Sequence, residues 1–259
     1  MRRIRLIIEY DGTEYVGWQV QPNGIAVQEA VERELTKLTD ERCALHASGR
    51  TDSGVHALAQ VAHFDTQSRI PADKFAFALN AGLPRDIRVL YSDEAEPSFH
   101  SRFDVKRKSY RYLVLNSPHD SAFTRNHALH VHHKLDVDKM NNAAALFLGE
   151  HDFLAFKASG ITLENTVRTI FASEWSKHGD MLSFDVTGSG FMYNMVRIMV
   201  GTMLEIGLGR RDVESIRRAF NEKSRSTCGV TAPAHGLYLA RVEYDGFDTA
   251  PFIRSTFIF

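Results

Sequence analysis

A short stretch in the first quarter of the chain brings together side chains that could do chemistry. Residues 48–57 read SGRTDSGVHA, which places Asp52 between Gly49 and Gly54, with Arg50 two positions before it. A ligand can approach a carboxylate in such a loop closely, because glycines allow tight turns and remove side-chain bulk. An Asx-turn in a solvated loop would use the same residues. In an extended segment Arg50 would lie on the same side as Asp52, where it would contact a phosphate or a base, or remain a surface charge.

A second candidate is an arginine inside the most apolar segment of the chain. Residues 192–208 read MYNMVRIMVGTMLEIGL, and helical spacing puts Arg197 on one face with Tyr193, Asn194 and Gly201. A buried cation without a partner is costly, so Arg197 needs a carboxylate or a ligand anion. A carboxylate held by such an arginine stays ionised, as a nucleophile or a general base requires. A structural ion pair, or an arginine at the exposed rim of the helix, would also explain the pattern.

A third candidate combines aromatic and basic side chains on one strand. Tyr110 and Tyr112 alternate with Arg111 directly after the basic run at 106–108. Aromatic faces on a strand can stack an exposed base while nearby cations hold the backbone of the nucleic acid. Two tyrosines that fill a core beneath a solvated charge run are an equally good explanation.

Other motifs give no cofactor or metal site. His130, His132 and His133 lack a third ligand at a convincing spacing, which disfavours a metal. Gly207 and Gly209 follow a helical pattern rather than a strand, so they do not form a dinucleotide fingerprint. No phosphate-binding loop of the Walker type and no local nucleophile signature was found in the sequence. The candidate chemistry therefore depends on a carboxylate, an arginine and a tyrosine, without a cofactor.

Composition restricts the class of protein without deciding its partner. The chain has 259 residues, 44% of them hydrophobic, and 31 basic against 32 acidic side chains give a net charge of −1. An RNA-binding surface would therefore have to be a local patch. Cys43 and Cys228 have no metal or redox spacing, and the start of the chain does not read as a signal peptide, so we expect a cytoplasmic protein. The apolar segment at 192–208 is too short and too charged to span a membrane.

The periodicity of the sequence predicts an α+β fold in two comparable halves. We expect residues 1–105 to carry the Asp52 loop and residues 106–259 to carry the helix with Arg197, with the two sheets joined around a central cleft. Expected strands cover 4–10, 60–64, 87–91, 108–115, 170–177, 182–186 and 237–244, and expected helices cover 27–38, 71–83, 137–147, 192–208 and 213–220.

Taken together, the motifs resemble one family along nearly the whole chain. They include EYDGTEYVGWQVQP, SGRTDSGVHA, NAGLPRDI, FHSRFDVKRKSYRYLV, FLGEHDFLAF, GSGFMYNMVRIMVG and GLYLARVEY. The chain resembles the TruA-type tRNA pseudouridine synthases, and the pair GRTDSGVHA and GFMYNMVRIMVG is far more specific than either motif alone. Ser53 stands where the family commonly has alanine, and the apolar tail at 247–259 extends beyond the last motif.

The resemblance implies a cofactor-free isomerase that converts uridine to pseudouridine at positions 38–40 of the tRNA anticodon stem-loop and works as a homodimer. Its partner would be tRNA, rather than DNA or a membrane, and its fold would be two ferredoxin-like halves. Asp52 would be the catalytic aspartate, Arg197 its partner, and Tyr110 the residue that stacks on the target uracil and is a candidate for proton removal. Arg50 would occupy the space that the flipped nucleotide leaves.

The reaction explains why these residue types are needed. The base must leave the stack, its bond to the ribose at N1 is broken, the uracil turns, C5 joins the ribose, and the C5 proton is removed. Asp52 could attack the sugar, attack the base, or remove a sugar proton, and the sequence does not choose. A catalytically silent RNA-binding or tRNA-chaperone module is the alternative function. A glycoside hydrolase would need a second acid, and none stands out.

Overall fold

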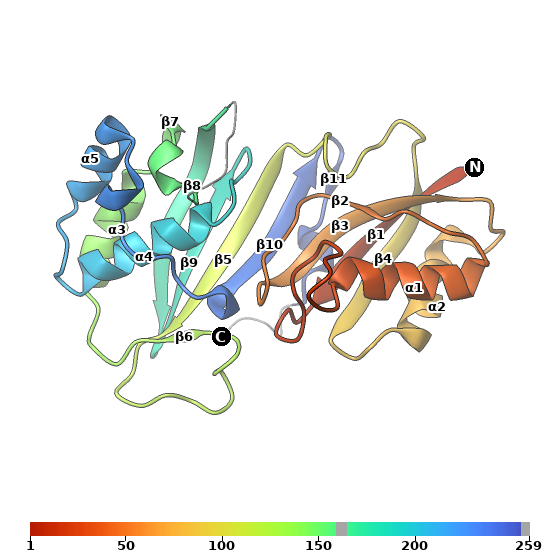
Figure 1. Ribbon diagram of the computed structural model, residues 1–259, viewed down its shortest axis with the longest axis horizontal. Helices are drawn as coiled ribbons and strands as arrows, with labels where there is room; N and C mark the ends of the chain where they lie inside the picture. Colours follow the sequence, from red (N-terminus) through yellow and green to blue (C-terminus); the bar gives the residue numbers. More distant parts are fainter. Residues whose placement is uncertain (159–164, 255–259) are drawn as a thin grey trace. The chain divides into compact units, whose positions relative to one another are not determined.

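The protein divides into two compact units in the computed structural model, which describes residues 1–158 and 165–254 (Figure 1). Of the described residues, unit 1 contains 1–106 and 238–254, and unit 2 contains those between 107 and 237. Each unit combines an antiparallel sheet with helices, so the predicted α+β class is confirmed. The expected junction of the two sheets around a central cleft stays a prediction.

Unit 1 follows a β-α-β-β-α-β order. Strand β1 pairs antiparallel with both β3 and β4, while the short β2 pairs with β3, which is the strand arrangement of a ferredoxin-like half. A further strand, β10, runs parallel to the start of β3. The elements are β1 (Arg2–Tyr10), α1 (Val27–Thr39), β2 (His46–Ala47), β3 (His56–Thr66), a short turn η1 (Ala72–Lys74), α2 (Phe75–Gly82), β4 (Ile87–Ala95), β10 (Leu237–Tyr244), β11 (Phe247–Asp248) and η5 (Ala250–Phe252).

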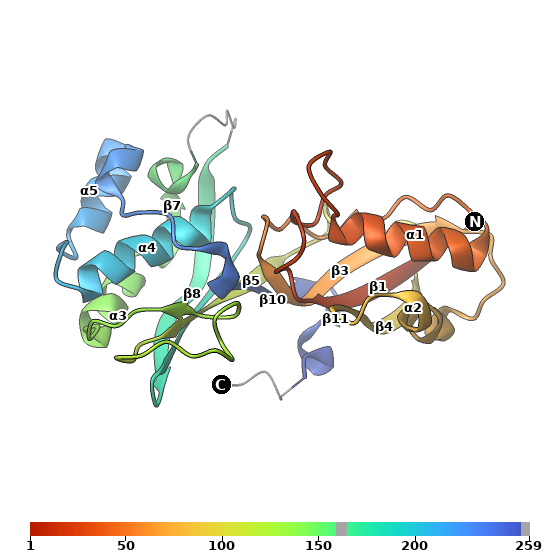
Figure 2. The ribbon, with the colours of Figure 1, turned by 60° about the horizontal axis from the view of Figure 1, so that its bottom comes forward.

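The sequence of β1 explains how this sheet forms. Ile4, Leu6 and Ile8 are fully buried, whereas Arg3 and Arg5 alternate with them on the other face. Arg3 pairs with Asp65 of β3 at 2.7 Å, so the polar face also stabilises the strand pairing. Helix α1 buries the apolar side chains of Val27, Ala30, Val31 and Leu35, and it packs beside α2 in unit 1 (Figures 1 and 2).

Unit 2 contains a second antiparallel sheet, in the order β5-β9-β8-β7. Helix α3 packs against α4 and β8 (Figure 2), and the indole nitrogen of Trp175 donates to the sulfur of Met203 at 3.2 Å. The elements are β5 (Arg107–Leu115), β6 (Leu129–His130), α3 (Val137–Ala145), β7 (Gly149–Asp152), η2 (Leu154–Phe156), β8 (Val167–His178), β9 (Met181–Gly188), α4 (Met195–Gly207), α5 (Ser215–Glu222), η3 (Arg225–Thr227) and η4 (Ala234–Gly236).

Two features differ from the sequence expectations. Helix α4 begins at Met195 rather than at residue 192, because Asn194 has a left-handed backbone with φ of 61° and ends the preceding turn. The segment 238–254 packs in unit 1, although residues 106–259 were all expected in the second half, because Tyr238 pairs with His56 of β3. The assignment of functions to two domains stays a prediction.

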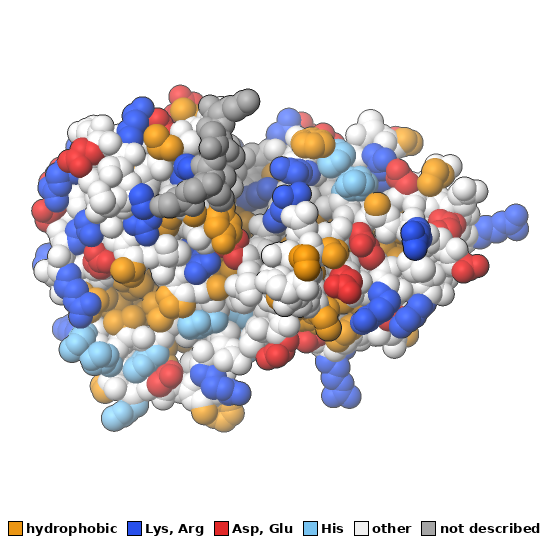
Figure 3. Space-filling view, viewed as in Figure 1, with side chains coloured by type: hydrophobic (Ala, Val, Ile, Leu, Met, Phe, Trp, Pro, Cys, Tyr) orange, Lys and Arg blue, Asp and Glu red, His pale blue; other side chains and the backbone are white. Residues whose placement is uncertain are grey.

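The apolar tail is partly described. Phe252 lies 4.4 Å from Tyr91 between ring centroids, and the guanidinium of Arg5 lies 3.4 Å over the ring of Phe247, so this part docks on unit 1. Residues 255–259 lie outside the described residues. On the face of each unit that Figure 3 shows, basic and acidic side chains are interspersed, in keeping with the net charge. Among the described helices, none has the length and apolar character to cross a membrane.

Candidate active site

Asp52 lies in the loop between β2 and β3, residues 48–55, called the Asp52 loop below. Asp52 is half-buried, whereas Arg50 is exposed. The first part of the loop is fixed to β3: the Ser48 amide donates to Val61 O at 2.7 Å, and the side-chain amide of Gln60 donates to Gly49 O at 2.8 Å. The loop that carries the Asp52 carboxylate is therefore anchored to a strand at its start.

The second part of the Asp52 loop is held by the segment that follows β1. Within this segment, residues 11–18, the amide of Trp18 donates to Thr51 O at 3.1 Å. Tyr15 O accepts from the amide of Gly54 at 3.4 Å and from the hydroxyl of Ser53 at 3.2 Å. Contacts on both sides restrict the position of the Asp52 carboxylate before any ligand binds, which is the preorganisation that catalysis requires.

Gly17 makes this close approach possible. Its φ is 108°, and a Cβ atom on it would lie 2.6 Å from Thr51 O and 3.1 Å from the carbonyl carbon of Asp52. Both the backbone conformation and the lack of space therefore require glycine. Gly54 also has a positive φ, of 75°, so its conformation is itself a reason for glycine in the loop. In the sequence Gly17 is one residue of the motif EYDGTEYVGWQVQP. No local pattern indicates which loop it contacts.

A buried tyrosine lies beside the Asp52 loop. The Tyr10 hydroxyl shares a 2.7 Å hydrogen bond with the Thr51 hydroxyl. Burial raises the pKa of Tyr10 well above its usual value, and the negative charge of Asp52 contributes in the same direction. Tyr10 is therefore a neutral hydrogen-bonding group near the carboxylate. Sequence reasoning gave no role to Tyr10 or Thr51, although each lies inside one of the motifs EYDGTEYVGWQVQP and SGRTDSGVHA.

Arg197 lies in the first turn of α4 in unit 2 and is half-buried. Its Nη1 donates to the side-chain oxygen of Asn194 at 2.8 Å, and its Nε donates to Ala232 O at 2.7 Å. The amide of Ala232 in turn donates to Arg197 O at 3.0 Å. The guanidinium is thus oriented by the left-handed Asn194 and by the chain segment that passes over the helix. Its pairing with Asp52, which lies in the other unit, stays a prediction.

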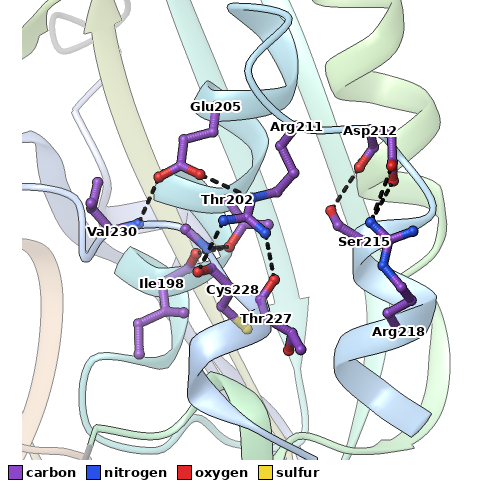
Figure 4. Close-up of polar contacts among 11 residues, drawn as sticks. Ile198, Thr202, Glu205, Arg211, Asp212, Ser215, Arg218, Thr227, Cys228 and Val230 are labelled. Atoms are coloured by element: carbon purple, nitrogen blue, oxygen red, sulfur yellow. Dashed lines mark hydrogen bonds and ion pairs between the residues drawn. The ribbon is translucent and has the colours of Figure 1, made fainter. Parts of the chain in front are cut away.

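The segment that orients Arg197, residues 225–232, is tied to α4 along its length (Figure 4). A Cβ atom on Gly201 would lie 1.8 Å from Val230 O, so the close packing depends on glycine. Glu205 accepts from the amide of Val230 at 3.0 Å and from Arg211 Nε at 2.9 Å. Arg211 also donates to Thr227 O at 2.7 Å. An ion pair therefore holds the segment whose Ala232 carbonyl contacts Arg197.

The tyrosines of β5 share one face, as their spacing predicts. Tyr110 is buried, with its ring 5.2 Å from that of Phe191 and edge-on to it. Tyr112 is fully buried and donates to Pro233 O at 2.9 Å. Burial raises the pKa of Tyr112, and the charge of Arg197 partly opposes this shift. On the opposite face Arg111 pairs with Asp185 at 2.8 Å. The core-filling interpretation therefore holds for Tyr112.

The three histidines at 130–133 do not lie together on one strand face. Only His130 lies in a strand, β6, and its Nε2 donates to Ser117 O at 2.8 Å. His132 and His133 follow the strand, with ring centroids 3.8 Å apart. One ring nitrogen of His130 thus donates a hydrogen bond to the backbone and is not available as a metal ligand. The spacing of the three histidines had already disfavoured a metal site.

An α+β chain with a carboxylate on a prearranged loop in one unit, and two tyrosines on a strand and an arginine on a helix in the other, has the parts of an enzyme of one known class. The profile of the tRNA pseudouridine synthase family matches residues 6–104 and 143–245, which include Asp52 and Arg197, while Tyr110 lies between the two matched segments. The chain therefore belongs to the tRNA pseudouridine synthase family.

Relatives of this chain extend over nearly its whole length. A protein of Ruminiclostridium cellulolyticum named tRNA pseudouridine synthase A is 49% identical over 245 residues, covering 94% of this chain and 100% of the relative. Proteins with the same name from Acetivibrio thermocellus and Bacillus pumilus are 48% and 46% identical over 94% of this chain, and the matches cover 100% and 99% of those proteins. These matches include all the motifs singled out above as candidate sites.

Proposed function

We propose that the protein isomerises uridine to pseudouridine in tRNA, with Asp52 as the catalytic carboxylate. The observation that carries this proposal is the Asp52 loop, which hydrogen bonds from β3 and from the 11–18 segment hold on both sides. A loop prearranged in this way reduces the entropy that must be lost when a nucleotide is positioned for reaction. The names of the full-length relatives support tRNA as the substrate.

The reaction is an isomerisation, so every atom of the uridine is retained. The target nucleotide leaves the stack, the N1–ribose bond breaks, the uracil turns, and a C5–ribose bond forms before the C5 proton is lost and N1 regains one. Asp52 assists by attacking the sugar, attacking the base, or removing a sugar proton. We assign Arg197 to keeping Asp52 ionised, Tyr110 to holding the uracil, and Arg50 to filling the vacated position in the RNA.

The finer aspects of the proposal follow from the family resemblance. We assign the target to positions 38–40 of the anticodon stem-loop, the active form to a homodimer, and the place of action to the cytoplasm. The exposed position of Arg50 supports its assigned role, because a side chain that inserts into RNA must be accessible before the RNA binds. The buried position of Tyr110 beside Phe191 supports a ring held in a fixed orientation.

The decisive test compares Asp52→Asn with Asp40→Asn. Asp40 is an exposed residue at the end of α1 in the same unit, so the control variant makes the same change in charge away from the loop. We expect Asp52→Asn to lower kcat by at least about 10²- to 10⁴-fold with folding and tRNA affinity retained, and Asp40→Asn to behave as wild type. Pseudouridine in tRNA from a deletion strain carrying each variant is measured by mass spectrometry. A normal pseudouridine level in the strain that carries Asp52→Asn would contradict the assignment of Asp52 as the catalytic carboxylate, whereas purified wild type without isomerase activity would favour the alternative of a catalytically silent RNA-binding module.

A further inference from the structure

An exposed cluster of rings on unit 1 has no part in the chemistry proposed above. It lies in the loop between β4 and β5 and consists of His100, Arg102 and Phe103, together with His46 of β2; we call it the ring cluster. Phe103 is 73% exposed, and its ring centroid lies 4.2 Å from that of His100. His100 lies 5.6 Å from His46, and the Arg102 guanidinium lies 5.7 Å over the Phe103 ring.

Hydrogen bonds fix this exposed loop in place. The Nδ1 atom of His100 accepts from the amides of Arg102 at 3.1 Å and Phe103 at 3.4 Å, while the Asp104 carboxylate accepts from the His100 amide at 2.7 Å. Burial lowers the pKa of His100, and the neighbouring His46 adds to the shift. His100 is therefore a neutral ring with its free nitrogen protonated at Nε2, and the loop presents its apolar ring faces at little cost in conformational entropy.

The ring cluster is joined to the base of the Asp52 loop. Ser101, which is fully buried, donates from its hydroxyl to His46 O at 2.6 Å, and its own carbonyl accepts from the hydroxyl of Tyr244 at 2.6 Å. His46 is followed by Ala47 and then by the Asp52 loop. Asp52 is six positions after His46, a contour of at most about 22 Å. An RNA with its target nucleotide at Asp52 can therefore reach the ring cluster within a short run of nucleotides.

We propose that the ring cluster is a stacking surface for an unpaired nucleobase of the RNA substrate, at a position other than the target uridine. The inference rests on the proposed function for the identity of the RNA. Rings with accessible faces and a cation beside them match a base and its phosphate, because base–aromatic stacking contributes about 1–3 kcal/mol and tolerates any base. Arg102 supplies the positive charge next to the Phe103 ring.

The test compares Phe103→Ala with Phe77→Ala. Phe77 on α2 is a matched control, since it is also 73% exposed in unit 1 and has a cation, Lys74, 5.5 Å from its ring. We expect Phe103→Ala to raise the Kd for unmodified tRNA and the KM by roughly 5- to 150-fold, with kcat changed less than about twofold. Phe103→Trp should restore affinity because it keeps a ring face, and Phe77→Ala should bind as wild type.

A second experiment finds the base that stacks. Transcripts carry one abasic nucleotide at each unpaired position of the anticodon loop in turn, and each is bound to wild type and to Phe103→Ala. For one transcript, the abasic nucleotide should weaken binding to wild type by the same factor as Phe103→Ala weakens binding of the intact transcript. Phe103→Ala should bind that abasic transcript almost as well as it binds the intact one, as a double-mutant cycle requires for a direct contact. Equal binding by Phe103→Ala and Phe77→Ala, or additive losses with every transcript, would overturn the stacking surface. Loss of isomerase activity in Asp52→Asn, or its absence in wild type, tests the proposed function separately.

Discussion

Units 1 and 2 hold their candidate catalytic side chains by different physical means. In unit 1, Asp52 comes from a loop without regular structure, and backbone amides and carbonyls together with Gly17 fix its shape. In unit 2, Arg197 comes from the first turn of a helix, and side chains such as Glu205 fix the segment that orients it. Backbone contacts tolerate most side-chain changes but no added Cβ atom at the contact, whereas a side-chain network is sensitive to the loss of a charge.

The largest effect should come from Gly17→Ala in unit 1. The new Cβ atom would lie 2.6 Å from Thr51 O, in a backbone conformation with φ of 108° that alanine rarely adopts. Strain and overpacking together should lower the free energy of unfolding by about 2–5 kcal/mol. We also expect kcat for pseudouridine formation to fall more than 10-fold, as about 1 Å of misplacement can cause. Urea denaturation and steady-state kinetics measure the two effects.

Gly246→Ala is the control for this prediction. Gly246 also has a positive φ, of 72°, but a Cβ atom on it would meet nothing within 4 Å. Its cost should be the backbone strain alone, about 1–2 kcal/mol, with kcat retained. If Gly17→Ala matched Gly246→Ala in both measurements, the Asp52 loop would not depend on the close approach of the 11–18 segment.

Gly201→Ala should have the next largest effect, in unit 2. Its Cβ atom would lie 1.8 Å from Val230 O, so the 225–232 segment must move away from α4 and take the Ala232 carbonyl with it. We expect a loss of about 1–3 kcal/mol in stability, after alanine's better helix propensity is included, and a clear fall in kcat. Gly209→Ala, where φ is 69° and no atom lies within 4 Å, should be destabilised without losing kcat. Equal kcat in the two variants would contradict a role of the segment in orienting Arg197.

Glu205→Gln should cause a smaller loss. The neutral glutamine keeps one acceptor oxygen but no longer forms the ion pair with Arg211. Its side-chain NH2 group must also face one of the two donors that Glu205 accepts from, Arg211 Nε or the Val230 amide. Since both side chains are mostly buried, we expect stability to fall by about 1–2 kcal/mol. We also expect a small fall in kcat, because Arg197 is held less firmly, and a kcat that depends less on salt than in wild type, because the ion pair that salt screens is gone. Asp212→Asn, which breaks the exposed pair with Arg218, should leave kcat unchanged (Figure 4).

The effect that is smallest at neutral pH is the dependence of stability on pH. Burial lowers the pKa of His63 to about 4, and the charges of Arg3, His100 and His46 act in the same direction while Asp65 opposes them. The unfolded chain takes up a proton near pH 6.5 and the folded chain does not, so stability decreases as pH falls from about 6.5 to 4. His63→Asn, which keeps an acceptor for the Ser101 amide, should reduce this slope by up to about 1.4 kcal/mol per pH unit. An unchanged slope in urea titrations would contradict the prediction.

Regular elements were largely predictable from the sequence, because their signals are local. The alternation in β1 and the apolar stripe of α1 each follow from residues a few positions apart. The start of α4 was wrong by three residues, since the left-handed backbone of Asn194 has no periodic signal. Strands of two residues, such as β2, are too short for alternation to identify.

The residues of the candidate site could be predicted from the sequence, but the residues that hold them in place could not. Asp52 and Arg197 stand out because a carboxylate between glycines and a cation in an apolar helix are unusual in themselves. Gly17 acts on Thr51, and Glu205 acts on Val230, across 34 and 25 residues of sequence respectively, and no local pattern encodes such contacts. The ring cluster was likewise missed, because the exposure of Phe103 is a property of the folded chain.

The return of β10 to unit 1 has a consequence for the order in which the chain is built. His56 pairs with Tyr238, so the sheet of unit 1 gains this strand only after the 181 residues between them have been synthesised. Unit 2 is continuous from residue 107 to residue 237 and is fully translated while the partner strand of β3 is still missing. Because contacts so distant in sequence form slowly, completion of unit 1 should be the late step, and a ribosome that stalls before residue 238 would leave β3 with an unpaired edge beside the Asp52 loop.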